Sequence, residues 1–185
     1  MPSQSEALRK ITEIFERNDI DYMLIGGWAL PAYGHIRSTI DIDIAIIVKT
    51  NKKLLDLILE LKNNDYQIPS DNQRLDQAMI QITDMSNMVE IELWLKPDGL
   101  VMDNMLLKKR SKGTIGGSSY WIIGPEDLII NKLSRPDRSE TDEMDVITVL
   151  KNQKKNLDWK YLEKRAKKAD IFSLLKTLEE RIDTI

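Results

Sequence analysis

The chain has 185 residues, of which 42% are hydrophobic and 31% are charged, and its net charge at pH 7 is -3. This size and hydrophobicity are enough for one ordinary domain with a buried core, and they argue against a disordered regulator. The balance of 27 basic and 30 acidic residues excludes a strongly basic footprint for nucleic acid, although it leaves a local basic patch open.

The chain contains no cysteine and a single histidine, His35. Disulfides, thiolate metal sites, a cysteine nucleophile and sites built from several imidazoles are therefore excluded. Any metal would have to bind carboxylate oxygens, which favour hard cations such as Mg2+. The N-terminus lacks the apolar stretch of a signal peptide, and the longest apolar run (44–48) is too short to span a bilayer. We therefore expect a soluble, cytoplasmic protein.

The first half of the chain mixes helical and strand patterns. Apolar spacing and turn residues predict a helix over 5–18, a short strand over 22–25, a short helix after the glycine pair at 26–27, a strand over 40–48, and a helix over 51–63 with Asn51 as its N-cap. A hairpin is expected over 77–83 and 88–95, and a further short strand pair around 116–123.

From Gly124 onward the sequence becomes helical. Pro125 fits the first position of a helix, and Ser139 with Asp142 forms a capping box for the next one. Two more helices are expected near 158–168 and 171–181. The predicted fold is α+β, with a small twisted mixed β-sheet flanked by helices. An α/β core over 1–123 and a C-terminal helical segment over 124–185, packed on the core, would form one compact unit.

Two acidic residues alternate with isoleucines in the predicted strand Ile40-Asp41-Ile42-Asp43-Ile44. Because strand side chains alternate between faces, Asp41 and Asp43 share one face. Two carboxylates on a partly buried surface repel each other unless a cation neutralises them, so a bound Mg2+ is the economical explanation. The preceding pair Gly26-Gly27, between a strand and a helix, would let the backbone approach a phosphate closely. A solvated strand face and an ordinary tight turn are the plainer alternatives.

A second acidic strand follows at Val89-Glu90-Ile91-Glu92-Leu93. If it lies beside the first, Glu90 or Glu92 completes a cluster of three carboxylates that could hold divalent ions or deprotonate an attacking hydroxyl. A solvated edge strand would account equally well for either glutamate alone.

The string GGWA, followed about a dozen residues later by RSTIDIDI, resembles the polymerase-beta-type nucleotidyltransferase superfamily. The resemblance is strongest to its small prokaryotic members, namely the toxin-type abortive-infection, minimal and antibiotic nucleotidyltransferases. It implies a turn at Gly26-Gly27, a metal pair at Asp41 and Asp43, and a third carboxylate at Glu92, which we prefer to Glu90. Residues 124–133 and 143–146 resemble two later helices of such proteins.

The resemblance implies Mg2+-dependent transfer of a nucleoside monophosphate from a nucleoside triphosphate to a hydroxyl, with release of pyrophosphate; Mn2+ could replace Mg2+. Glu92 would accept the proton of the acceptor hydroxyl. The acceptor could be a tRNA end, a protein hydroxyl or an aminoglycoside-like antibiotic. A non-catalytic antitoxin or regulatory nucleotide-binding module of the same fold, in a toxin-antitoxin pair, is the main alternative, and a metal-dependent phosphohydrolase is another.

Two basic residues are further candidates for nucleotide binding. Arg37 could contact the triphosphate or orient Asp41, or form a structural salt bridge. Lys132 could reach phosphates, although an exposed helix lysine is the commoner case. His35, Trp28 and Tyr33 are interpreted as packing residues. Residues 151–168 carry eight basic side chains, which would suit an RNA acceptor or a solvated helix face.

Overall fold

The computed structural model describes residues 4–69 and 74–182. Its internal contacts divide the chain into two compact units. The sheet unit comprises Met1–Trp28, Thr39–Pro97 and Lys112–Ile122, and the helical unit comprises Ala29–Ser38, Asp98–Ser111 and Ile123–Ile185. The helical unit thus includes Ala29–Ser38 and Asp98–Ser111, which the expected division between residues 123 and 124 assigned to the core. That division stays a prediction.

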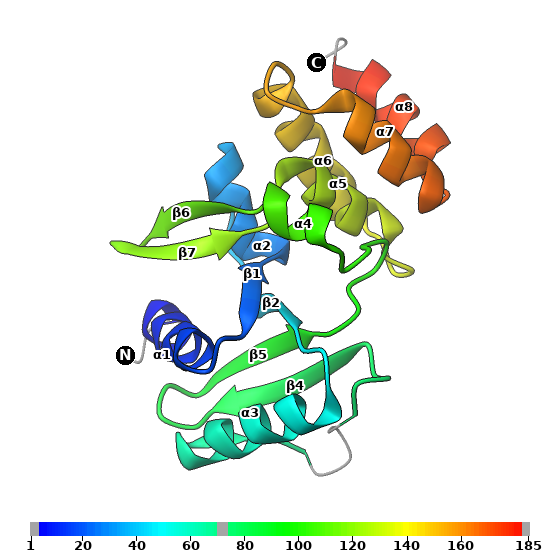
Figure 1. The fold of residues 1–185 in the computed structure, drawn as a ribbon. Coiled ribbons are helices and arrows are strands. Elements are labelled where there is room, and N and C mark those ends of the chain that lie inside the picture. Colours follow the sequence, from blue (N-terminus) through cyan, green and yellow to red (C-terminus); the bar gives the residue numbers. More distant parts are fainter. Residues whose placement is uncertain (1–3, 70–73, 183–185) are drawn as a thin grey trace. The chain divides into compact units, whose positions relative to one another are not determined.

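A mixed seven-stranded sheet organises the sheet unit (Figure 1). Its strands run in the spatial order β3-β4-β5-β2-β1-β7-β6. The strand bounds are β1 (Asp21–Leu24), β2 (Ile42–Ile47), β3 (Tyr66–Gln67), β4 (Met79–Asp84), β5 (Val89–Trp94), β6 (Ser111–Ile115) and β7 (Ser118–Ile122). β2 pairs with β5 in parallel and with β1 in the antiparallel sense, so the two acidic strands are direct neighbours. The expected α+β fold is confirmed.

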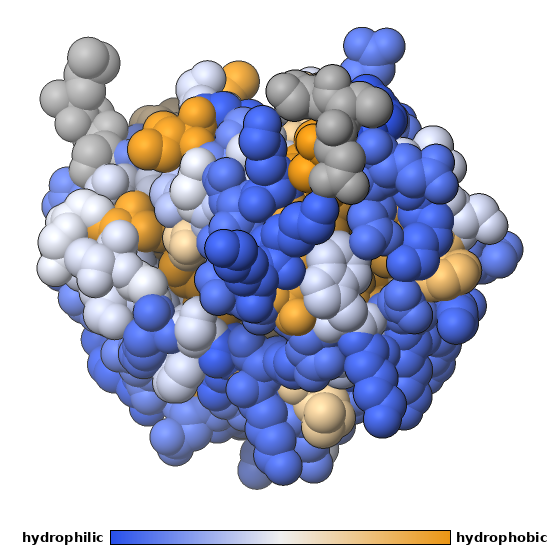
Figure 2. Space-filling model, turned by 90° about the horizontal axis from the view of Figure 1, so that it is seen from above, coloured by the Kyte–Doolittle hydropathy of each residue, from blue (hydrophilic) through white to orange (hydrophobic). Residues whose placement is uncertain are grey.

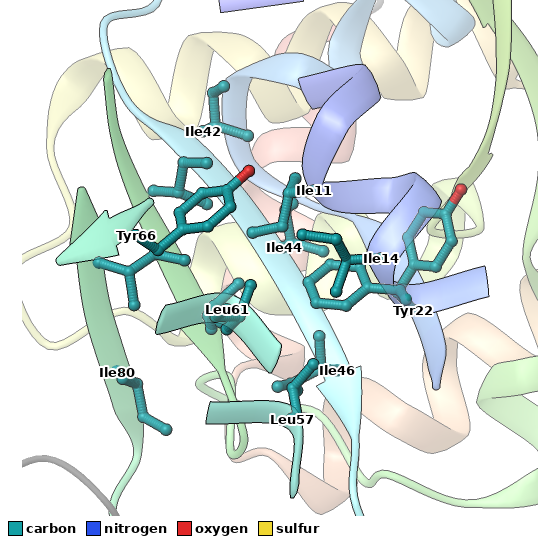
Figure 3. Packing of buried hydrophobic residues seen from close by; sticks show 14 of the residues in the cluster. Ile11, Ile14, Tyr22, Ile42, Ile44, Ile46, Leu57, Leu61, Tyr66 and Ile80 are labelled. Atoms are coloured by element: carbon teal, nitrogen blue, oxygen red, sulfur yellow. The ribbon is translucent and has the colours of Figure 1, made fainter. Parts of the chain in front are cut away.

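Two helices supply the apolar cover of one face of this sheet, α1 (Gln4–Arg17) and α3 (Asn51–Asn63). Their buried side chains form one apolar cluster with the isoleucines of β2 and β4, and Figure 3 shows Ile11, Leu57, Ile44 and Ile80 among its members. Burial of this face fixes which residues of β2 and β5 point inward, and therefore which point to the opposite face.

Short helices follow β1 and precede β6: α2 (Gly26–Ala29), the 3-10 turn η1 (Leu30–Tyr33) and α4 (Asn104–Lys109). The helical unit is built mainly from α5 (Pro125–Ser134), α6 (Glu140–Gln153), α7 (Trp159–Lys168) and α8 (Phe172–Ile182). Within it α5 packs against α6 and α7, and α8 packs against α6 and α7. Pro125 is at the start of α5 and the capping box at Ser139 and Asp142 is present, as predicted.

Two local expectations are corrected. The cap of α3 is Thr50, whose Oγ1 accepts from the backbone N–H of Lys53, and Asn51 is the first helical residue. The central strand begins at Ile42 and not at Ile40, whose side chain is 83% exposed. A chain that bends before Ile42 leaves no partner strand against which Ile40 could be buried.

Among the described residues, no helix combines the length and apolarity needed to cross a bilayer. On the face drawn in Figure 2 hydrophilic residues predominate, and the hydrophobic ones occupy small separate areas. Scattered apolar side chains of this kind are normal on protein surfaces.

Candidate active site

Asp43 and Glu92 lie directly opposite each other on the neighbouring strands β2 and β5. The flanking pairs are Ile42 with Ile91 and Ile44 with Leu93, and all four of these apolar side chains are buried. Since successive side chains of a strand point to opposite faces, the two acidic residues share the other face of the sheet. The register therefore brings together two carboxylates that are 49 positions apart in the sequence.

The carboxyl groups of Asp43 and Glu92 are in hydrogen-bonding contact. Burial, this hydrogen bond and the negative charge of Asp43 together raise the pKa of Glu92 to about 7. The indole N–H of Trp94, 3.1 Å from Oε2 of Glu92, acts in the opposite direction. Two carboxylates held this close repel each other, so a proton or a cation between them would stabilise the pair.

Asp41 lies in the bend immediately before β2 and its side chain is exposed. Its negative charge also raises the pKa of Glu92, as the weakest of the causes. Within residues 4–69 and 74–182, no three acidic or histidine side chains are already arranged to hold a metal ion. The structure thus shows a contacting pair with a third carboxylate close by in the chain, and the metal and catalytic roles of these residues stay predictions.

The geometry separates the two glutamates of β5. Glu90 is exposed, pairs in register with Thr83 of β4, and accepts from Nε2 of Gln81 at 3.2 Å. Glu92 is the one that faces Asp43. This arrangement supports the sequence-based preference for Glu92 as the third carboxylate.

The turn at Gly26-Gly27 approaches Asp43 very closely. A Cβ atom on Gly26 would lie 2.0 Å from Oδ2 of Asp43, and the φ of Gly26 is +59°. A Cβ atom on Gly27 would lie 2.7 Å from the side chain of Thr39. The backbone N–H of Ile25 donates to the carbonyl oxygen of Asp43 at 3.0 Å, which fixes the turn beside the strand. A side chain at Gly26 would displace the carboxyl group of Asp43, and one at Gly27 would displace the side chain of Thr39.

Arg37 and His35 meet Asp145 of α6 within the helical unit. Nε of Arg37 lies 2.9 Å from Oδ1 of Asp145, its NH2 group lies 3.0 Å from Oδ2, and Nε2 of His35 lies 2.9 Å from Oδ1. Burial alone would raise the pKa of Asp145, but the hydrogen bonds from Arg37 and Lys132 hold it below its usual range. These contacts support the salt-bridge interpretation of Arg37, and its nucleotide-binding role stays a prediction.

Lys132 is almost completely buried, so the alternative of an exposed helix lysine is wrong. Its Nζ lies 2.9 Å from a carboxylate oxygen of Asp142 and 2.9 Å from one of Asp145. An ammonium group engaged by two carboxylates is already neutralised, so the contacts lend no support to the predicted phosphate role.

The basic segment is also not uniformly solvated. Arg165 is buried and donates to Tyr161 at 2.9 Å and to Asp103 at 2.7 Å, so it belongs to the interior of the helical unit. Lys160, Lys164 and Lys168 are exposed. Tyr33 is buried and its hydroxyl donates to the carbonyl of Ile123, in line with the packing role expected for it.

Sequence reasoning missed Trp94 and Asp145. Trp94 stands two residues after Glu92 and therefore on the same strand face, a relationship that was available from the sequence. Asp145 was part of a recognised helix pattern, but nothing in the sequence indicated that it would accept hydrogen bonds from a loop more than 100 residues earlier.

Comparison with known proteins decides the family. The model of the family described as "Nucleotidyl transferase of unknown function (DUF2204)" matches residues 4–179, nearly the whole chain. The chain belongs to this nucleotidyl transferase family. The resemblance to the polymerase-beta-type superfamily, noted from the motifs at 26–43, is thereby confirmed. No curated protein matches the sequence.

Solved structures with the same fold include antibiotic-modifying enzymes. The lincosamide antibiotic adenylyltransferase LnuA, bound to lincomycin, is 19% identical with a TM-score of 0.57, over 80% of this chain and 98% of that one. ANT(2")-Ia in complex with adenylyl-2"-tobramycin is 13% identical with a TM-score of 0.57, over 90% and 97%. An antigenic nucleotidyltransferase-like protein from Paracoccidioides brasiliensis is 18% identical with a TM-score of 0.53, over 92% and 90%. At these identities the likeness establishes the fold.

Proposed function

We propose that this nucleotidyl transferase moves a nucleoside monophosphate from a nucleoside triphosphate to a hydroxyl group, with Mg2+ as its cofactor, and that the Asp43–Glu92 pair is the centre of the reaction. The observation that carries the proposal is the strand register that sets these two acidic residues opposite each other, with Gly26 packed directly against Asp43. The family match gives the transferase class, and the site supplies residues able to perform the chemistry.

The residues suit a hard divalent cation. Their donors are all carboxylate oxygens, which Mg2+ and Mn2+ prefer. Asp43 and Glu92 lie opposite each other in register, and two negative charges so close together repel. A divalent cation between them would relieve this repulsion, and the exposed Asp41, two residues before Asp43, is the residue proposed as the third ligand. When bound, the cation would neutralise negative charge on the triphosphate and polarise its α-phosphorus.

Each residue then has a defined task. Asp43 and Asp41 would hold the cation and orient the triphosphate for in-line attack. The turn at Gly26-Gly27 would lie along the phosphates, because it has no side chains to obstruct them. Glu92, which faces Asp43, would take the proton from the attacking hydroxyl.

We propose ATP as the donor and a small hydroxyl compound as the acceptor, with the structural neighbours as support. One of them, LnuA, is a lincosamide antibiotic adenylyltransferase bound to lincomycin, and another, ANT(2")-Ia, is in complex with adenylyl-2"-tobramycin. We therefore propose an aminoglycoside- or lincosamide-like polyhydroxylated molecule ahead of a tRNA end, which none of these neighbours supports. A non-catalytic module is the second candidate. The presence of both Asp43 and Glu92, opposite each other on neighbouring strands, argues against it.

Asp43→Asn tests the proposal. It should abolish Mg2+-dependent ATP binding, measured by calorimetric titration, and acceptor labelling by radioactive ATP, while the melting temperature changes little because Asp43 is not part of the apolar core. Glu90→Gln is the matched control, since Glu90 occupies the same face of β5 outside the pair, and it should behave like wild type. Full binding and labelling by Asp43→Asn would refute the assigned centre. Binding without labelling of any acceptor by the wild type would favour the non-catalytic module.

A further inference from the structure

Trp94 stands beside the acidic pair on the same face of β5. It follows Glu92 by two residues, and its side chain is only partly exposed. Its neighbour in register on β2 is Ala45 and on β4 is Met79. Opposite the small side chain of Ala45, the large indole has room to turn back along the strand toward Glu92.

The indole makes one directional contact with the site. Its Nε1–H donates to Oε2 of Glu92 at 3.1 Å. An indole nitrogen is a donor only, so the proton of this hydrogen bond belongs to tryptophan and the glutamate oxygen must accept. One oxygen of Glu92 is thus occupied on the side of Trp94, and the carboxyl group as a whole also contacts Asp43.

Glu90 provides the contrast within the same strand. It is exposed, and its hydrogen-bonding partner is the flexible amide of Gln81. Glu92 is half-buried, and its partner is a rigid ring with two side-chain torsions. A carboxylate held by a rigid donor keeps one orientation, and groups that orient a metal ligand or a base typically change affinity or activity when removed.

We propose that Trp94 is a positioning residue for Glu92: its indole N–H fixes the rotation of the Glu92 carboxyl group so that the free oxygen faces Asp43 and the incoming hydroxyl. The proposal rests on the proposed function for its catalytic meaning. The hydrogen bond and its effect on cation binding are properties of the resting protein and can be measured separately.

Trp94→Phe removes the donor and keeps an aromatic ring. We expect the affinity for Mn2+, measured by calorimetric titration without nucleotide, to fall about 10-fold, and kcat to fall about 10- to 100-fold with less than a threefold change in the KM for ATP. Trp159→Phe is the matched control, because the Trp159 indole also donates a hydrogen bond, to the carbonyl oxygen of Lys154 at 3.1 Å, in the helical unit. It should leave both quantities unchanged.

A spectroscopic measurement reports the contact directly. The chain has four tryptophans, so a two-dimensional 15N–1H spectrum contains four indole signals, which single Trp→Phe variants assign. In Glu92→Gln the Trp94 signal should shift upfield, because a neutral amide oxygen is a weaker acceptor than a carboxylate. The Trp159 signal should stay in place. Glu90→Gln should leave both signals where they are.

The outcomes separate the two proposals. If Trp94→Phe transfers as fast as the wild type, the positioning role is wrong and the proposed function is unaffected. A Trp94 signal indifferent to Glu92→Gln also overturns it. If Trp94→Phe is normal but Trp94→Ala raises the KM for ATP, the ring stacks on the nucleotide and the positioning role is wrong. If Trp94→Phe binds Mn2+ more weakly than the wild type but the wild type shows no transfer activity, the positioning role is supported and the proposed function is wrong.

Discussion

Gly26 lies closer to Asp43 than any other residue type would allow. Its φ of +59° is in the left-handed region, and an added Cβ atom would lie 2.0 Å from Oδ2 of Asp43, far inside van der Waals contact. Backbone strain and overlap therefore both act at one position. The carboxyl group of Asp43 would have to rotate away, and with it the contact with Glu92.

Gly26→Ala should separate these two effects when it is compared with Gly116→Ala. Gly116 has a φ of +57°, but its added Cβ would meet only the side chain of Ser5, at 3.5 Å. Both variants should lose about 1–2 kcal/mol of unfolding free energy from strain. Only Gly26→Ala should also lose Mg2+-dependent ATP binding, measured by calorimetric titration. Equal ATP binding by the two variants would contradict the close approach to Asp43.

The choice between Glu90 and Glu92 shows what a single strand leaves open. Both alternate with apolar residues and share one face, so the local pattern treats them alike. The register of β5 against β2 distinguishes them, because it places Glu92 opposite Asp43. Register is set by how two distant segments bury their apolar faces together, and this is a tertiary property.

At the scale of elements, buried ion pairs join α5 to α6. Lys132 of α5 contacts Asp142 and Asp145 of α6, and the latter also accepts from Arg37 and His35. The residues of the second sequence resemblance, at 124–133 and 143–146, therefore include a lysine and an aspartate that hold two helices and the 34–38 loop together. Their contacts are internal to the helical unit.

Lys132→Met should destabilise the helical unit by about 3–5 kcal/mol, because it leaves two buried carboxylates without their shared cation. Lys164→Met is the control: Lys164 is an exposed lysine within α7, and its replacement should change the unfolding free energy by less than about 0.5 kcal/mol. Urea unfolding followed by circular dichroism measures both. Near-wild-type stability of Lys132→Met would show that the two carboxylates find other partners.

At the scale of the whole molecule, buried carboxylates make stability depend on pH. Burial raises the pKa of Asp127 to about 6, although a hydrogen bond from Tyr161 and the charge of Arg165 oppose the rise. Because its pKa is higher in the folded state than in the unfolded chain, the folded state binds the proton more tightly. The contribution of Asp127 therefore favours folding at low pH and is lost as the pH rises from about 4 toward 6.

Asp127→Asn should remove this dependence. The unfolding free energy of the variant minus that of the wild type should increase between about pH 4 and pH 6 and then level off. The total increase should be up to roughly 3 kcal/mol, since each pKa unit corresponds to about 1.4 kcal/mol. The asparagine oxygen can still accept from Tyr161, so the shape of the site is kept. Urea titrations from pH 4 to pH 8 measure the difference. A difference that is constant across this range would contradict a protonated Asp127 in the folded state.

The sequence by itself determined the α+β class, most helices and strands, the superfamily and which acidic residues are proposed for the site. These features follow from periodicity, caps and motifs that extend over a few neighbouring residues. Only the tertiary structure placed Glu92 against Asp43, turned the Trp94 indole onto Glu92, buried Lys132 between two aspartates and left Ile40 exposed. Strand order, register and burial depend on contacts between segments far apart in the chain, and local sequence patterns do not contain that information.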